Sequence, residues 1–221
     1  STTGLIQQAR EWVEQGYRSL LIPAEGVDVS QNLQRLDALR SSIADGVELR
    51  FDGGNAFSRM QAVDLVTGLA RDGFRFLLDV LRSPSNEALE QLHGVSQSPL
   101  ALGRTVVSPA GVFTQAPMVQ HIVLSPERME DGWRGVWRAA AVADAAGVTA
   151  SLALSQTAGL ATAALLHLAA ATPSLAAAHD LGQAAAESSI LLEPLEPQDG
   201  MLSVPLGEGL GVEAERDGRE A

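Results

Sequence analysis

The stretch VELRFDGGNAFSRMQAVDLVTGLARDGFRFLL, residues 47–78, contains the pattern that decides the fold. Two short apolar runs, Val47–Phe51 and Phe74–Leu78, are typical of buried strands. Between them, Ser58–Asp72 has the length and apolar spacing of a helix. Two strands joined through a helix are expected to pair in parallel, because parallel strands need a long crossover connection.

The same alternation continues on both sides of this unit. Further strands are expected at Ser19–Ile22, Leu100–Leu102, His121–Leu124 and Thr149–Leu154, with a weak one at Ile190–Leu192. Further helices are expected at or near Leu5–Gln15, Ser30–Ala44, Asn86–His93, Ser108–Gln115, Gly132–Ala146 and Gly159–Ala171. This repetition predicts a (β/α) barrel over residues 1–192, and periodicity alone leaves a doubly wound open sheet as the alternative. Residues 193–221 are rich in proline, glycine and acid, so they are expected to be irregular, with a hairpin-like element around Gly200.

Composition excludes several classes of function. The 221 residues include 15 basic side chains, all arginine, and 27 acidic ones, for a net charge of −12. Such a chain would repel nucleic acid, and no apolar run reaches the roughly 18 residues of a membrane span. The absence of cysteine excludes disulfides and thiolate chemistry and is typical of a cytoplasmic protein. The absence of lysine excludes Schiff bases and lysine acid–base pairs.

The polar residues that follow the expected strands are the candidates for a site, because a barrel of this kind places its active site at the carboxyl ends of its strands. They are Asp52, Asp79, Arg104, Ser125 and Ser155. Two carboxylates could hold a hard cation, which usually takes three or more oxygen ligands. Alternatively, Asp79 pairs with Arg104, whose guanidinium opposes a cation and favours a carboxylate ligand.

The four histidines are interpreted as core or surface residues rather than as bases. His121 opens a strand, at the opposite end from the expected site, and His167 lies inside an apolar helix. His93 ends a helix and His179 lies in a loop. Nucleotide-binding, zinc-protease and serine-hydrolase motifs are absent from the sequence.

Several stretches resemble the enolase superfamily, in particular the barrel of the muconate-lactonizing-enzyme subgroup, which includes o-succinylbenzoate synthases and N-acylamino-acid racemases. The matching stretches follow one another in the family's order and cover nearly the whole chain: GYRSLLI (16–22), LRFDGGNAFS (49–58), SPLALGRTV (98–106), HIVLSPERM (121–129), AAAVADAAGV (139–148), SQTAGLATAALLHLAAATP (155–173) and LLEPLEPQDGMLSVPLGEGLGVE (191–213). The last two are the most specific. The resemblance implies a modified TIM barrel.

The resemblance also implies a magnesium ion that stabilises an enolate and lysines that move an α-proton. The three metal-ligand positions of the family fall on Asp52, Leu78 and Arg104, so Asp52 remains as a remnant ligand and no magnesium is expected. The lysine positions fall on Leu21, Pro23 and Ser125.

Members of the family also have an N-terminal capping domain, and this chain begins at about the first barrel helix. The resemblance therefore implies that a capping domain and the first strand are absent from the chain. A preceding segment or a partner chain, in a homo- or hetero-oligomer, is expected to complete the barrel and protect its open edge.

Three hypotheses of function follow. The first is a catalytically degenerate barrel that serves as a scaffold or binds a small carboxylate through Arg104, Ser125 and Ser155. The second is a divergent lyase, isomerase or racemase that works without a metal, with Arg104 binding a carboxylate and Asp52 or Asp79 as base. The third is a structural subunit that completes a hetero-oligomer with an active relative.

Overall fold

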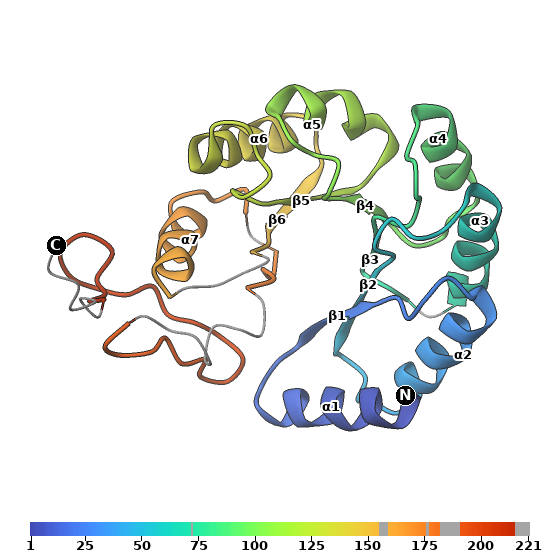
Figure 1. Ribbon diagram of the computed structural model, residues 1–221, viewed down its shortest axis with the longest axis horizontal. Coiled ribbons are helices and arrows are strands. Elements are labelled where there is room, and N and C mark those ends of the chain that lie inside the picture. Colours follow the sequence, from blue (N-terminus) through green and yellow to red (C-terminus); the bar gives the residue numbers. More distant parts are fainter. Residues whose placement is uncertain (72, 155–158, 176, 182–190, 215–221) are drawn as a thin grey trace, which may run out of the picture.

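The computed structural model (Figure 1) describes residues 1–71, 73–154, 159–175, 177–181 and 191–214. Within these residues, six parallel strands form one sheet in the order β1–β2–β3–β4–β5–β6. They are β1 (Ser19–Pro23), β2 (Glu48–Asp52), β3 (Phe76–Leu78), β4 (Leu100–Leu102), β5 (His121–Leu124) and β6 (Thr149–Leu152). Each strand pairs with the next one along the chain, so the sheet is wound in one direction. This order contradicts the doubly wound alternative and confirms the barrel type.

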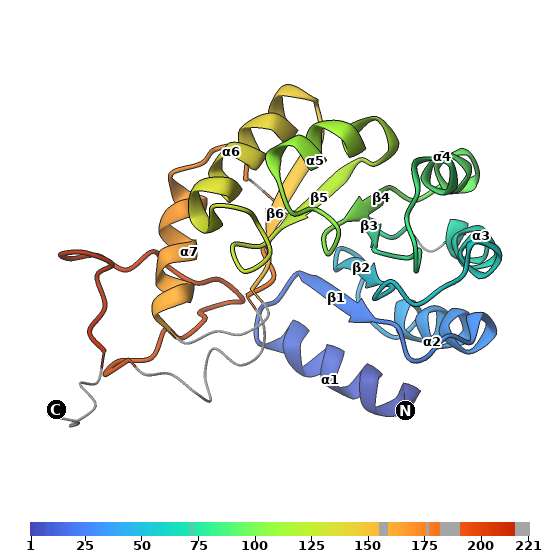
Figure 2. The ribbon, with the colours of Figure 1, turned by 45° about the horizontal axis from the view of Figure 1, so that its top comes forward.

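The helices lie outside the curled sheet, with α1 before β1 and one α-helix after each strand, as Figures 1 and 2 show. They are α1 (Thr2–Glu14), α2 (Val29–Arg40), α3 (Arg59–Gly68), α4 (Asn86–Val95), α5 (Pro109–Gln115), α6 (Gly132–Ala145) and α7 (Leu160–Ala170), with short 3₁₀ turns η1 (Leu69–Arg71) and η2 (Ala116–Met118). Beyond β6, the described chain adds a single parallel bridge, in which the amide of Leu154 donates to the carbonyl of Asp180 at 3.0 Å. In the part of the chain that the structure describes, the sheet is therefore an arch that is open between β1 and β6.

Helix ends differ from the sequence predictions where side chains cap them. The helix expected from Ser30 begins at Val29, because the Asp28 carboxylate accepts the amide of Gln31. It ends at Arg40 and not near Ala44, because the Arg40 guanidinium donates to the carbonyls of Ala44 and Val47 and so stabilises the turn that follows.

The strand boundaries agree with the sequence predictions where the apolar runs are short. β4 and β5 have the expected bounds, whereas β3 starts at Phe76 and β6 ends at Leu152, shorter than expected. The strand expected at Ile190–Leu192 is wrong in its described part, because Leu191 forms an isolated antiparallel bridge with Ala214. The hairpin-like element around Gly200 is present, since Gln198 and Met201 exchange backbone hydrogen bonds of 2.8 and 3.0 Å.

The sheet has two buried faces that differ in what they contact. On the outer face, Leu49, Phe51, Leu77, Ile122 and Leu124 are fully buried in the main core, against the helices. The inner face holds a smaller apolar cluster of Phe76, Leu78, Ala101 and Val123, with Leu21 and Ala153 packed against it. Alternation along each strand therefore directs every second side chain into the lumen of the arch.

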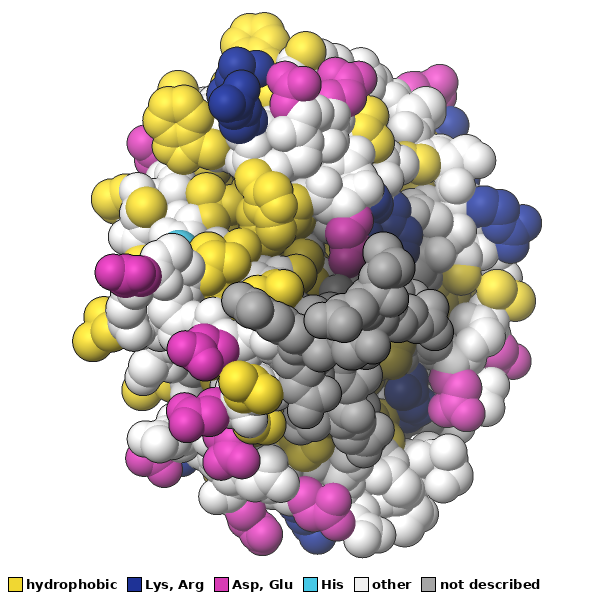
Figure 3. Space-filling view, turned by 60° about the vertical axis from the view of Figure 1, so that its left-hand side comes forward, with side chains coloured by type: hydrophobic (Ala, Val, Ile, Leu, Met, Phe, Trp, Pro, Cys, Tyr) yellow, Lys and Arg dark blue, Asp and Glu magenta, His cyan; other side chains and the backbone are white. Residues whose placement is uncertain are grey.

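The described part of the C-terminal segment, residues 191–214, lies at the open side of the arch (Figure 1). Its acidic side chains Glu193, Glu196, Asp199, Glu208 and Glu213 are all exposed. In Figure 3, which views that side, acidic side chains are spread over the lower part and hydrophobic ones gather in the upper part. In the described residues, no helix has the length and apolarity to cross a membrane.

Candidate functional site

Three charged side chains meet at the carboxyl ends of β2, β3 and β4. Asp52 is the last residue of β2, Asp79 directly follows β3, and Arg104 comes two residues after β4. The register pairs Asp52 with Leu78 and Leu78 with Ala101. Because the three strands are parallel neighbours, these residues lie at one edge of the sheet, as the sequence predicted.

Two backbone features bring the ends of these strands together. Asp79 has a left-handed conformation, φ 47°, which directs its carboxylate to the amides of Gly103 and Arg104. Gly53 passes so close to the next strand end that a Cβ atom there would lie 2.6 Å from the Cα of Val80. A glycine is therefore required beside Asp52.

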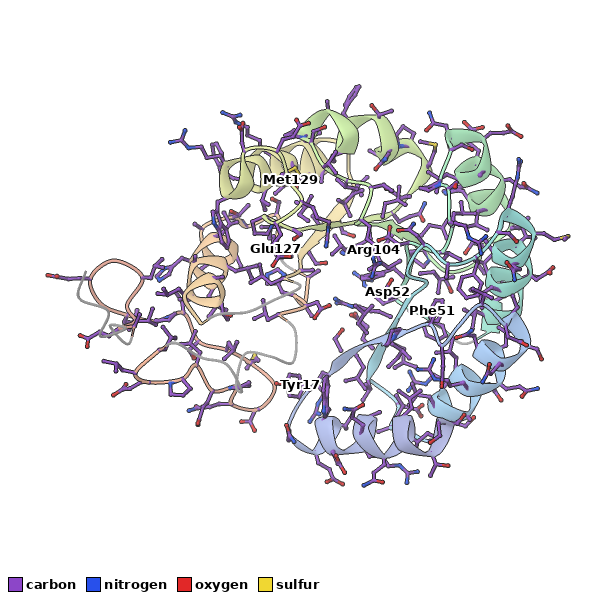
Figure 4. All side chains as sticks on the ribbon, in the orientation of Figure 1. Tyr17, Phe51, Asp52, Arg104, Glu127 and Met129 are labelled. Atoms are coloured by element: carbon purple, nitrogen blue, oxygen red, sulfur yellow. The ribbon has the colours of Figure 1, made fainter. Side chains whose placement is uncertain are left out.

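The guanidinium of Arg104 joins the two carboxylates. Its Nη1 donates to Oδ1 of Asp52 at 2.7 Å and to Oδ2 of Asp79 at 3.1 Å, and its Nη2 donates to Oδ2 of Asp52 at 2.8 Å. Figure 4 shows Arg104 and Asp52 next to each other on the inner side of the arch. The pair of parallel bonds to Asp52 is the bidentate geometry in which arginine binds carboxylates most strongly.

Burial differs among the three charged groups. The side chain of Asp79 is fully buried, that of Asp52 is 13% exposed, and that of Arg104 is 43% exposed. Burial raises the pKa of Asp79, although the amides of Arg104 and Gly103 and the Arg104 charge act against this shift. The pKa of Arg104 is raised, first by its hydrogen bonds to Asp52. The guanidinium is therefore permanently charged.

One edge of the Arg104 guanidinium has no partner among the described residues. Its Nε–H and the second hydrogen of Nη2 have no acceptor among the described residues, and these two donors form one edge of the planar group. The side chain is 43% exposed and lines the cavity in the lumen. This edge has the geometry to bind a carboxylate through two hydrogen bonds.

The other residues of the predicted site have different surroundings. Ser125 is 1% exposed, and its hydroxyl has no hydrogen-bond partner in the described structure. Ser155 lies outside the described residues. At the remaining family positions, Leu21 and Leu78 belong to the inner apolar cluster, and Pro23 ends β1 with its carbonyl accepting from Arg35.

The residues at this edge do not fit a magnesium ion. Of the three ligand positions implied by the family resemblance, Leu78 offers an apolar side chain and Arg104 offers a cation. Both carboxylates already bind that cation. Among the described residues, no group of three or more histidine, cysteine or acidic side chains could hold a metal ion.

A second polar cluster lies deeper in the lumen, and sequence reasoning did not identify it. The ring of Phe76 stacks on His121 with centroids 4.3 Å apart, and the guanidinium carbon of Arg50 lies 5.0 Å from the Phe76 centroid. Arg50 also binds Glu48 and the carbonyl of Ala178. The alternating polar residues Glu48, Arg50 and Asp52 of β2 were the available signal, because such a period of two places all three on one face.

His121 is a neutral, hydrogen-bonded part of this cluster. Its Nδ1 lies 2.7 Å from the hydroxyl of Thr149, which itself donates to the carbonyl of Gln120, so Nδ1 carries the proton. Its Nε2 then accepts from the hydroxyl of Ser151 at 2.8 Å. Burial lowers the pKa of His121 to about 3, with the charges of Arg50 and Arg75 acting in the same direction.

The other three histidines each have a hydrogen-bond partner that is not Asp52, Asp79 or Arg104. Nδ1 of His93 lies 3.0 Å from Nε2 of Gln120, and Nε2 of His167 lies 3.2 Å from the carbonyl of Leu210. His179 accepts the amide of Leu152. Burial also lowers the pKa of His179.

The three charged residues Asp52, Asp79 and Arg104 line the same open cavity as the deeper cluster around Arg50 and Phe76. Its volume is about 2260 Å³, and its wall includes Asp52, Arg104, Arg50 and Ser151. A further arginine, Arg128, also lines this cavity, and its buried Nε has no hydrogen-bond partner in the described structure. The lumen is thus rich in arginine donors although the chain as a whole is acidic.

Comparison with known proteins gives one family. The model of the "Enolase C-terminal domain-like" family matches residues 4–218. Muconate cycloisomerase 1 of Rhodococcus opacus is 24% identical over 216 residues, which are 96% of this chain and 58% of the relative. A probable glucarate dehydratase of Streptomyces coelicolor is 28% identical over 97% of this chain and 49% of its own length.

Solved structures give the same fold. The muconate lactonizing enzyme of Pseudomonas fluorescens, solved with muconolactone, superimposes with a TM-score of 0.91 at 20% identity, over 97% of this chain and 59% of that one. The chain therefore spans roughly half to three fifths of the length of the relatives it matches.

Proposed function

Because the chain belongs to the enolase C-terminal domain-like family, we propose that it is a barrel domain of the mandelate racemase and muconate-lactonizing type that binds a small carboxylate without metal-dependent proton abstraction. The observation that carries this proposal is the guanidinium of Arg104, which binds Asp52 and Asp79 at the ends of three adjacent strands. The relatives named above include an isomerase and a dehydratase, so the proposal concerns a change of function within one family.

The proposed loss of proton abstraction follows from two features of the chain. Abstraction of an α-proton needs a base near the substrate and a positive centre that stabilises the enolate. The chain has no lysine, and the lysine positions of the family hold Leu21, Pro23 and Ser125. The charge of Arg104 is already shared between two carboxylates, so less of it is available to an enolate.

Carboxylate binding is supported by the free edge of Arg104. A ligand carboxylate can accept from Nε and Nη2 while the bonds to Asp52 and Asp79 stay in place. The apolar inner cluster around Leu78 and Val123 would contact the body of the ligand. The buried hydroxyl of Ser125, just after β5, is a further group with no hydrogen-bond partner among the described residues.

The experiment pairs a binding measurement with an exchange measurement. Phenylacetate and succinate are titrated into the protein by calorimetry, and exchange of the α-protons of the same two ligands is followed by NMR in D₂O with magnesium present. We expect saturable binding that Arg104→Gln removes and no exchange above the uncatalysed rate. Arg59→Gln is the control, because Arg59 forms an ion pair with Glu87 on the exposed surface, where both of its Nη atoms donate to Oε1. Exchange that depends on magnesium, or no carboxylate binding, contradicts the proposal.

A second candidate is a divergent, metal-independent lyase or isomerase with Asp52 as base. Asp52 is the member of the carboxylate pair that solvent reaches, and it lies beside the ligand edge of Arg104. If Asp52→Asn removes a measured turnover while the unfolding transition is unchanged, this candidate is supported. Unchanged turnover excludes it.

We also propose that a capping domain or a partner chain completes the barrel. One edge of β1 pairs with β2, and no described strand pairs with the other edge. The matched segment covers 58% and 49% of the length of the two curated relatives named above. Light scattering on the chain alone tests this proposal, and a monodisperse monomer would contradict it. The proposal is supported if the chain alone forms oligomers or aggregates and these disperse when a capping domain is added as a separate chain.

A further inference from the structure

One nitrogen atom of Arg104 occupies a bridging position between two carboxylates. Nη1 lies 2.7 Å from Oδ1 of Asp52 and 3.1 Å from Oδ2 of Asp79. A metal ion that bridged these two oxygen atoms would lie between them, in the position of Nη1. The guanidinium therefore stands where a shared metal ion would lie.

The four carboxylate oxygens have N–H donors from all sides. Oδ1 of Asp52 accepts the amide of Gly54 in addition to Nη1, and Oδ2 accepts Nη2. In Asp79, Oδ1 accepts the amide of Gly103, and Oδ2 accepts both the amide and the Nη1 of Arg104. Oδ1 of Asp52 and Oδ2 of Asp79, which share Nη1, each accept two N–H groups, so a metal ion bound between them would have to displace Nη1.

We propose that Arg104 is a fixed internal cation that replaces a divalent metal ion at this strand edge and makes the site independent of metal. A guanidinium is charged at every physiological pH and is attached to the chain, so it neutralises the aspartates without any bound ion. The proposal concerns this chain's cation and does not depend on which ligand the lumen binds.

A consequence is that the two aspartates need Arg104. Without its charge, two carboxylates from adjacent strands would lie within a few ångströms of one another, and Asp79 is fully buried. Like charges at that distance repel strongly in a partly buried site, so an external cation would gain affinity. An acid in place of Arg104 would add a third oxygen ligand from the third strand end, which is the minimum that a hard cation usually requires.

The test measures Mn²⁺ by electron paramagnetic resonance and the unfolding temperature with MgCl₂ or with EDTA. Arg104→Glu is the gain-of-binding variant, Arg104→Lys keeps the charge without the fork, and Arg59→Gln is the surface control. We expect no saturable Mn²⁺ binding by the wild type, Arg104→Lys or Arg59→Gln. In Arg104→Glu we expect saturable Mn²⁺ binding, with an affinity at least about tenfold above any residual binding by the wild type. The unfolding temperature of this variant should rise when magnesium replaces EDTA.

The wild-type measurement decides the proposal even if Arg104→Glu does not fold. Saturable Mn²⁺ binding by the wild type that Asp52→Asn removes overturns it, as does a folded Arg104→Glu that binds no more Mn²⁺ than the wild type. Carboxylate binding by the wild type is a separate measurement, so its failure would affect the proposed function and leave this proposal standing.

Discussion

Arg104 and Asp52 come from strand ends that are two positions apart in the sheet, yet they form a bidentate ion pair across the end of β3, with bonds of 2.7 and 2.8 Å. The intervening strand allows this contact because it ends at Leu78, and the carboxylate of Asp79, the next residue, joins the same guanidinium at 3.1 Å. The pair thus ties three strand ends together.

Removal of Asp79 is expected to destabilise the fold more than removal of Asp52. The Asp79 carboxylate is fully buried and accepts three N–H groups, so Asp79→Ala leaves these donors unpaired and should cost about 3–5 kcal/mol. Asp52 is nearer to solvent, and Asp52→Ala should cost about 1–2 kcal/mol. Urea unfolding of both variants measures the difference, and equal costs would contradict the assigned burial.

His121 makes stability depend on pH in a defined window. Because its pKa is lowered from 6.5 to about 3 in the folded protein, the unfolded chain binds the proton more readily below pH 6.5. The stabilising contribution is therefore complete above about pH 6.5 and decreases toward pH 3, by about 1.4 kcal/mol per pH unit at most.

The variant His121→Gln isolates this contribution, because glutamine can replace the hydrogen bonds but does not titrate. The free energy of unfolding is measured for wild type and variant between pH 4 and pH 8. We expect the wild type to lose stability relative to the variant as the pH falls. A constant difference over this range would show that His121 is not a buried neutral group.

The close approach at Gly53 predicts a steric effect. A methyl group there would lie 2.6 Å from the Cα of Val80, so Gly53→Ala must push β2 and β3 apart at their ends and should cost about 2 kcal/mol or more. Gly94→Ala in α4 is the control, since a Cβ there has no atom within 4 Å, and it should stabilise the helix by about 0.5–1 kcal/mol. Similar thermal shifts for both variants would contradict the packing.

The fold could be predicted to a large extent from local pattern. β4 and β5 have the bounds that their apolar runs indicate, because each run is short and ends at turn residues. The predictions failed where side chains decide an end, as at Asp28 and Arg40 of α2, because capping depends on which polar atom reaches the backbone. The order of the strands in the sheet distinguishes a barrel from a doubly wound open sheet. Local periodicity does not determine this order, so the sequence pattern left both folds possible.

The location of the three charged residues at one edge of the sheet could be predicted from the sequence, but the geometry of their contacts could not. Asp52, Asp79 and Arg104 follow apolar runs, so their location at one edge follows from parallel pairing. The bridging position of Nη1 depends on the left-handed turn at Asp79, which the sequence does not indicate. The stack of Phe76 on His121 joins β3 and β5, which are two positions apart in the sheet, so no local pattern links the two residues.

The central claim is that the charge of Arg104 stands in place of a divalent ion at this strand edge. Calorimetric titration of the wild-type protein with MgCl₂ at pH 7 tests it most directly. We predict no saturable heat up to about 10 mM magnesium, since all four carboxylate oxygens already accept N–H donors. Saturable binding at millimolar affinity or tighter, lost in Asp52→Asn, would contradict the claim and would favour a magnesium-dependent, enolate-forming enzyme.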